Sequence, residues 1–186
     1  MMFASTTVTS EYRTGMIRTT FQAVPNRTVV LCAKAFVSAA FCGVFAAVIG
    51  VVSIAVARAV AGPSIGERLS LGEPATWRPI GAIALYAVLG AVLAVGIAAL
   101  LRQAAGVVAV VLLVPLVIEP LVASLPNVGP QIAPYLPFAN AFTFTEVPWF
   151  QRFDMHWGPG GALWYFTGIV AAVFGAAVFA INRRDA

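Results

Sequence analysis

One pattern in the sequence matches a catalytic motif by its letters. Residues 62–66 read Gly-Pro-Ser-Ile-Gly, which fits the G-x-S-x-G turn that presents a nucleophilic serine in hydrolases. That turn needs a strand before the serine, a helix after it, and an acid and a histidine further along the chain. Here the pattern follows a long apolar run, and the sole histidine, His156, lies in a distant loop. The sequence therefore predicts no hydrolase.

Metal and nucleotide chemistry lack their usual residues too. One histidine and two cysteines, without a C-x-x-C pair, give no zinc-ligand spacing. Cys32 and Cys42 stand ten residues apart in one apolar run, about 15 Å along a helix, whereas the Cα atoms of a disulfide lie ~4.4–6.8 Å apart. The only lysine, Lys34, belongs to no G-x-x-x-x-G-K-[ST] loop. We predict that the chain has no catalytic site, metal site or cofactor and is not itself an enzyme.

Glu119 is the one ionisable residue inside an apolar run. It lies some 15 residues after Ala104, or about 22 Å along a helix, in the outer third of a bilayer. Carboxylates at such depth are costly and mark functional sites, which makes Glu119 a candidate for a substrate path. The alternative is that Pro115 and Pro120 break the helix, so that Glu119 reaches water at the outer face and caps a short helix. Both interpretations stay open.

The composition indicates where these residues lie. The 186 residues are 61% hydrophobic and 10% charged, with a mean hydropathy of +0.93. These values exclude a soluble globular protein, which is ~45–50% apolar and ~25% charged. They also exclude a disordered chain, which combines low hydrophobicity with high net charge. The net charge of +4 bears on membrane orientation rather than on nucleic acid, and we expect no nucleic-acid partner.

Four uncharged or nearly uncharged runs are long enough to cross a bilayer, which takes about 20 residues of helix. They span residues 35–57, 81–101, 104–125 and 161–181. None shows the polar face that a helix in a soluble protein would carry. The sequence thus predicts an all-α polytopic membrane helical bundle over residues 35–186, preceded by a cytosolic segment over residues 1–34.

The distribution of cations predicts the orientation. Four spans place both chain ends on one side of the membrane, and that side carries Arg13, Arg18, Arg27, Lys34, Arg102, Arg183 and Arg184. The opposite side carries Arg58, Arg68, Arg78 and Arg152. Because an excess of lysine and arginine marks the cytoplasmic side, we expect both termini in the cytosol.

The loop over residues 126–160 combines prolines, which break helices, with aromatic residues, which favour the headgroup level. The prolines are Pro126, Pro130, Pro134, Pro137, Pro148 and Pro159, and the aromatic residues are Tyr135, Phe138, Phe142, Phe144, Trp149, Phe150, Phe153 and Trp157. One interpretation is a re-entrant or in-plane helix over the outer mouth of a pathway. The other is an interfacial anchor without a transport role.

Two stripes of small residues could let helices approach closely in lipid. One comprises Gly161, Gly168 and Gly175, and the other Ala39, Gly43 and Ala47.

Residues 10–24 predict a short cytosolic helix. Ser10 can serve as its N-cap and Pro25 ends it. A polar stripe of Glu11, Gly15, Arg18 and Gln22 runs beside an apolar stripe of Ile17, Phe21 and Val24. Such a helix could lie on the membrane or dock on a soluble partner.

Segments along nearly the whole chain together resemble the ABC-2 type permeases of bacterial ABC exporters. They are Glu11–Thr20, Ala23–Arg27, Val30–Lys34, Leu100–Gly106, Val117–Leu121, Tyr135–Phe138 and Asn182–Asp185. The resemblance implies that Glu11, Arg13, Gly15 and Arg18 belong to the coupling helix that meets an ABC ATPase subunit. It also implies a re-entrant segment before the last span.

The resemblance implies a permease that moves a small amphipathic or lipid-like substrate outward across the bacterial plasma (inner) membrane. A separate ATPase would drive alternating access, and the permease would pair with a second copy or a sister permease in contact with membrane lipid. Family members have six spans, two of them before the coupling helix, and this chain begins about ten residues before Glu11. We expect a start assigned too late, with two further apolar spans upstream in the same reading frame; a separately encoded piece and a degenerate permease are the alternatives.

Two other functions are compatible with the residues. One is a non-transporting scaffold or assembly subunit that docks through the small-residue stripes and uses Glu119 as a helix cap. The other is an ion- or proton-coupled carrier that works through Glu119.

Overall fold

The computed structural model describes residues 26–60, 74–146 and 154–183. These residues are 89% helical and contain no strand, which confirms the all-α prediction. The elements are α3 (Arg27–Val60), α5 (Pro74–Leu101), α6 (Ala104–Leu113), the π-helical turn η2 (Val114–Ile118), α7 (Glu119–Ala123), α8 (Gly129–Ile132), the 3-10 turn η3 (Ala133–Tyr135), α9 (Pro137–Thr145) and α10 (Pro159–Arg183).

Four helical stretches are long and apolar enough to cross a membrane, so the chain is a multi-pass membrane protein. They are Arg27–Val60, Thr76–Leu101, Ala105–Ala123 and Pro159–Arg183. Each contains most of one predicted span, but the first is much longer than residues 35–57. The 34 residues of α3 extend about 51 Å at 1.5 Å per residue, well beyond a ~30 Å hydrocarbon core.

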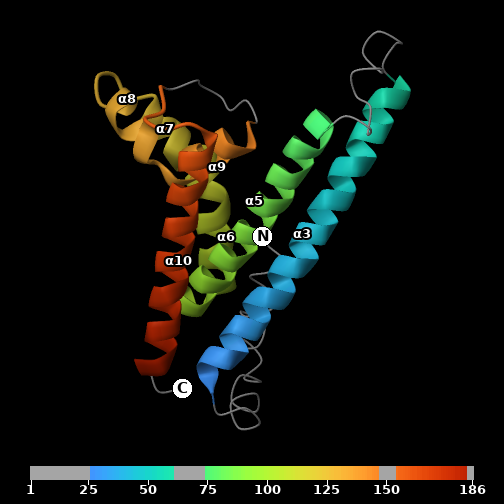
Figure 1. Ribbon diagram of the computed structural model, residues 1–186. Helices are drawn as coiled ribbons and strands as arrows, with labels where there is room; N and C mark the ends of the chain where they lie inside the picture. The colour runs from blue at the N-terminus through green and yellow to red at the C-terminus, as the bar shows by residue number, and fades with distance from the viewer. Residues whose placement is uncertain (1–25, 61–73, 147–153, 184–186) are drawn as a thin grey trace.

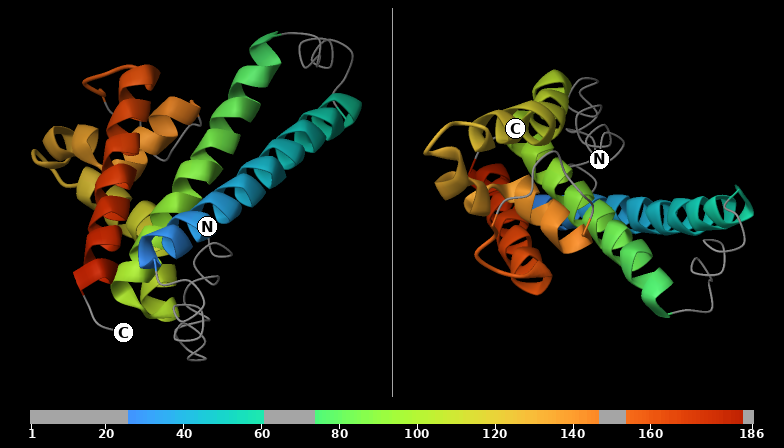
Figure 2. Two further views of the ribbon diagram at one scale, coloured as in Figure 1. Left: turned by 60° about the horizontal axis from the view of Figure 1, so that its bottom comes forward. Right: turned by 90° about the horizontal axis from the view of Figure 1, so that it is seen from above.

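The helices form a bundle in which α5 is central (Figure 1). α5 packs against α3, α6 and α10. α3 and α10 lie close at one end of the bundle and diverge toward the other, where α7, α8 and α9 gather around the start of α10 (Figures 1 and 2). The bundle is therefore tightly closed at one end and carries the short helices at the other.

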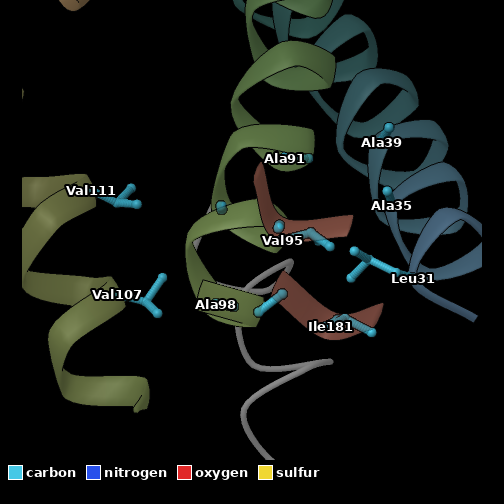
Figure 3. Close-up of a cluster of buried hydrophobic side chains, with 12 residues drawn as sticks. Leu31, Ala35, Ala39, Ala91, Val95, Ala98, Val107, Val111 and Ile181 are labelled. Atoms are coloured by element: carbon cyan, nitrogen blue, oxygen red, sulfur yellow. The ribbon is translucent and has the colours of Figure 1, made fainter. Parts of the chain in front are cut away.

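The closed end has a core of small and branched apolar side chains (Figure 3). Leu31 of α3, Val95 of α5 and Ile181 of α10 converge there, and Val107 of α6 points toward α5. The central helix contributes a run of buried alanines to this core: Ala91, Ala94, Ala98 and Ala99. Small side chains allow the close helix contacts on which packing in lipid depends.

The two small-residue stripes have different surroundings. A Cβ added at Gly43 would lie 2.6 Å from Val88 Cγ2, so this stripe lies where α3 meets α5. A Cβ at Gly168 or Gly175 would meet no described heavy atom within 4 Å. The stripe on α10 therefore does not pack against another described helix at these two positions.

Polar contacts join the described ends of the first and last spans. The Arg27 guanidinium donates to the carbonyl oxygen of Ile181 at 3.3 Å. The Asn182 amide donates to the Thr28 hydroxyl at 3.0 Å. The start of α3 and the end of α10 therefore lie at the same end of the bundle, and the side of the membrane that this end faces stays a prediction.

Candidate functional site

The third span is one continuous helical stretch whose hydrogen-bond pattern changes after α6. Pro115 and Pro120 lack the backbone N–H that an α-helix bonds to the carbonyl four residues earlier. The chain accommodates them by forming η2 from Val114 to Ile118, and the Glu119 N–H bonds to the Val114 carbonyl, five residues back, in the π-helical pattern. Turns of this kind often occur at functional positions because they redirect side chains. The expectation that the prolines break the helix is therefore wrong, because α7 follows η2 directly, and the Glu119 side chain is only 4% exposed.

The Glu119 carboxylate caps α9. Its Oε1 accepts the Phe138 N–H at 2.8 Å, and its Oε2 accepts the Ala139 N–H at 2.8 Å. These are the second and third residues of α9, whose N-cap, Leu136, has an apolar side chain that cannot accept a hydrogen bond. A negative charge at a helix N-terminus also interacts favourably with the helix dipole. Glu119 therefore supplies from another helix the acceptors that α9 lacks locally.

The sequence anticipated a capping role for Glu119 as one of two alternatives, and the structure shows a cap. The expected surroundings were wrong, however. Glu119 is buried among protein groups instead of reaching water at the outer face. A role in a substrate path stays a prediction.

Asn140 is the second buried polar residue of this region and is fully inaccessible. Its Nδ2 donates to the carbonyl oxygens of Pro134 and Leu136, both at 2.9 Å. Its Oδ1 accepts the Trp157 indole N–H at 2.6 Å. Because a buried amide needs partners for most of its donor and acceptor positions, these bonds fix α9 relative to η3 and to the segment before α10.

An aromatic cluster holds α9 between α5 and α10. Phe138 and Phe144 of α9 lie with their ring centroids 6.0 and 6.5 Å from that of the fully buried Phe166 of α10. Tyr86 of α5 lies 6.2 Å from the same ring. The described part of residues 126–160 therefore packs into the bundle, and its re-entry into the membrane stays a prediction.

Further polar contacts tie the short helices to the spans. Arg78 of α5 forms an ion pair with Glu146, which follows α9 and has a left-handed backbone with φ 56°. The Tyr165 hydroxyl of α10 donates to the carbonyl oxygen of Tyr135 at 2.8 Å.

The other predicted site residues lie outside the part of the chain that the structure describes. This applies to Glu11, Arg13, Gly15 and Arg18 of the predicted coupling helix, and to the Gly-Pro-Ser-Ile-Gly pattern. In the described ranges, no three side chains of His, Cys, Asp or Glu gather into a group that could hold a metal ion.

The hydrogen bond between Asn140 and Trp157 was not predicted from the sequence. Asn140 stands among Phe138, Phe142 and Phe144. A single amide within such an aromatic run is a signal of a buried hydrogen-bonded group, because an amide enters an apolar environment at high cost unless it is bonded.

The described fold and site define a class: a polytopic α-helical membrane protein whose last span is preceded by a short helix that is capped by a glutamate of the third span. Comparison with protein-family models, with curated proteins and with solved structures finds no match to this chain. The specific function is therefore a matter for proposal.

Proposed function

We propose that the chain is the membrane-spanning permease subunit of an ATP-binding-cassette exporter, driven by a separate ATPase subunit. Its substrate would be a small amphipathic or lipid-like molecule that is moved outward. The observation that supports this proposal most is the placement of α9. The resemblance to ABC-2 permeases implies a re-entrant element between the third described span and the last one, and α9, which Glu119 caps, is the candidate for this element.

The shape of α3 suits the transmission of a push from a coupling helix. α3 is one continuous helix from Arg27 to Val60, and it begins directly after residues 10–24. ATP binding in the partner would displace the coupling helix and, with it, the start of α3. The bonds from Arg27 and Thr28 to the end of α10 would carry that displacement to the last span. The free energy of ATP binding in the ATPase would in this way shift the equilibrium between the inward-facing and outward-facing states of the bundle.

The geometry at Glu119 favours this proposal over an ion-coupled carrier. Both carboxylate oxygens are engaged by backbone N–H groups of α9. A carrier that loads and releases a proton at this carboxylate would have to weaken the cap in each cycle. The reason is that a protonated carboxyl group accepts hydrogen bonds from the two N–H groups less strongly than a carboxylate does.

The test is whether the chain depends on a motor. The tagged chain is purified in mild detergent, and an ATP-hydrolysing subunit is expected to accompany it. Glu11→Ala and Arg13→Ala are each expected to remove that subunit while the chain still inserts in the membrane. Arg58→Ala, at the opposite end of α3 from Arg27, is the matched control and should retain it.

Three outcomes would contradict the proposal. If the ATPase stays bound after both changes, the coupling assignment is wrong. If no ATP-hydrolysing subunit accompanies the unaltered chain, the result favours a scaffold or assembly subunit. Transport that is lost with Glu119→Gln but proceeds without ATP would instead indicate an ion-coupled carrier.

A further inference from the structure

A hollow of about 220 Å³ opens between α5, α9 and α10 at the end of the bundle that carries the short helices. Its lining includes Arg78, Gly81 and Leu85 of α5, Phe144 of α9, and Gly160 and Leu163 of α10. The glycines help to create it, since a Cβ added at Gly81 or Gly160 would meet no described heavy atom within 4 Å. The walls are apolar, and a guanidinium group stands among them.

The hollow lies near the ends of two membrane-spanning stretches, where we expect the bilayer to change from headgroups to acyl chains. These stretches begin at Thr76 and Pro159, so Arg78, Gly81, Gly160 and Leu163 lie in their first two turns. Leu85 stands seven residues beyond Arg78, about 10 Å deeper along the helix. Two exposed tryptophans, Trp77 and Trp164, occupy the same turns, and tryptophan favours the membrane interface.

The charged groups at this level form a pair of opposite sign. Arg78 and Glu146 are bonded to each other, and their side chains are 61% and 49% exposed. A ligand head with one negative charge alone would be attracted by Arg78 but repelled by Glu146. A head that carries both a phosphate and an ammonium group complements both charges, because the guanidinium donates to phosphate oxygens and the carboxylate accepts from the ammonium.

We propose that this hollow binds one zwitterionic phospholipid of the surrounding bilayer, of the phosphatidylethanolamine type. The phosphate lies at Arg78, the ammonium group at Glu146, and the upper part of one acyl chain between Leu85, Phe144 and Leu163. The site is separate from the proposed transport function, because it requires neither a motor nor a pathway through the bundle.

Native mass spectrometry of the full chain in detergent tests this site. Phosphatidylethanolamine and phosphatidylglycerol with identical acyl chains are titrated separately, and the number of retained lipids is counted. We expect one ethanolamine lipid to bind about tenfold more tightly than the glycerol lipid, the equivalent of ~1.4 kcal/mol. Glu146→Gln should remove this preference, because only the ethanolamine head carries the ammonium group that is placed at Glu146, whereas both lipids carry the phosphate that is placed at Arg78. Equal retention of both lipids by the unaltered chain would overturn the proposal.

Filling the hollow tests its location. Gly160→Leu adds a side chain where the structure has space, and it should reduce retention of the ethanolamine lipid at least tenfold. Gly168→Leu is the matched control, because Gly168 lies in the same helix, also has space for a Cβ, and does not line the hollow. It should bind as the unaltered chain does.

A second measurement keeps the proposal testable if Gly160→Leu fails to fold. A phosphatidylethanolamine with a photoactivatable group in its acyl chain is incorporated in vesicles that contain the unaltered chain. After irradiation, the cross-linked peptides should come from α5 near Leu85, from α9 near Phe144 or from α10 near Leu163. Retention unchanged by a folded Gly160→Leu variant, or cross-links confined to other helices, would contradict the assignment.

Discussion

Removal of the Glu119 carboxylate should loosen α9 without unfolding the bundle. In Glu119→Ala, the Phe138 and Ala139 N–H groups lose their acceptors. A buried donor left without a partner costs about 1–3 kcal/mol, and the Ala139 N–H is only partly buried. We therefore expect the free energy that holds α9 in place to fall by about 2–4 kcal/mol.

A buried cysteine can report this opening. Ala141, in the middle of α9, has no exposed surface, so Ala141→Cys should react with a maleimide only when α9 opens. The two natural cysteines are first replaced by alanine. When opening and closing are fast relative to labelling, the rate follows the population of the open form. A loss of 2–4 kcal/mol then corresponds to labelling about 30- to 700-fold faster.

Two other carboxylate variants calibrate the result. Glu119→Gln keeps one carbonyl oxygen as an acceptor and should give an intermediate rate. Glu146→Gln removes an exposed carboxylate that is paired with exposed Arg78, and such surface pairs contribute at most about 1 kcal/mol. If Glu119→Ala labels no faster than Glu146→Gln, the cap does not hold α9 and the reasoning fails.

Further substitutions test the contacts around α9. Trp157→Phe removes the indole N–H that donates to Asn140 Oδ1, and the free energy of unfolding in detergent should fall by about 1–3 kcal/mol. When Trp157→Phe is combined with Asn140→Leu, the two effects should not add in a double-mutant cycle. Gly129→Ala would place a Cβ 2.1 Å from the Ala123 carbonyl oxygen and should lower the melting temperature clearly. Gly81→Ala has space for its Cβ and should stabilise α5 by up to about 1 kcal/mol, measured by thermal denaturation in the same detergent.

The four spans could be predicted from the sequence because each apolar run is long and uncharged or nearly uncharged. The helix ends could not. α3 continues past Lys34 and Arg58, which interrupt the apolar run but not the helix. Long cationic side chains can extend toward water while their backbone stays helical, so a charge marks the end of the hydrocarbon region more reliably than the end of the helix.

The place of the irregularity in the third span was also foreseeable, because Pro115 and Pro120 lack backbone donors, but the helix continues through them as η2 and α7. The partner of Glu119 was not foreseeable. Its contact with Phe138 and Ala139 joins positions nineteen and twenty residues apart, and it depends on the path of the intervening turns. Local patterns of hydrophobicity and proline carry no information about that path. The same limit applies to the bond between Asn140 and Trp157.

The position of α9 explains why its cap must be a charged group from another helix. α9 begins at Pro137 after Leu136, a sequence that offers no local acceptor, and it is packed where water has little access. The first N–H groups of a helix need acceptors, and hydrogen bonds to a carboxylate are the strongest available. The cost of burying Glu119 is thereby offset by two charge-assisted bonds.

The two interpretations of Glu119, cap and functional carboxylate, are therefore not independent. If Glu119 ever takes up a proton in a transport cycle, its bonds to Phe138 and Ala139 weaken and α9 must loosen at that step. Transport lost in Glu119→Gln would then be accompanied by faster labelling of Ala141→Cys. If Glu119 acts only as a cap, transport should fall in proportion to the loosening of α9. A variant that loosens α9 through another contact, such as Trp157→Phe, should then lose as much transport as a Glu119 variant whose Ala141→Cys label reacts at the same rate.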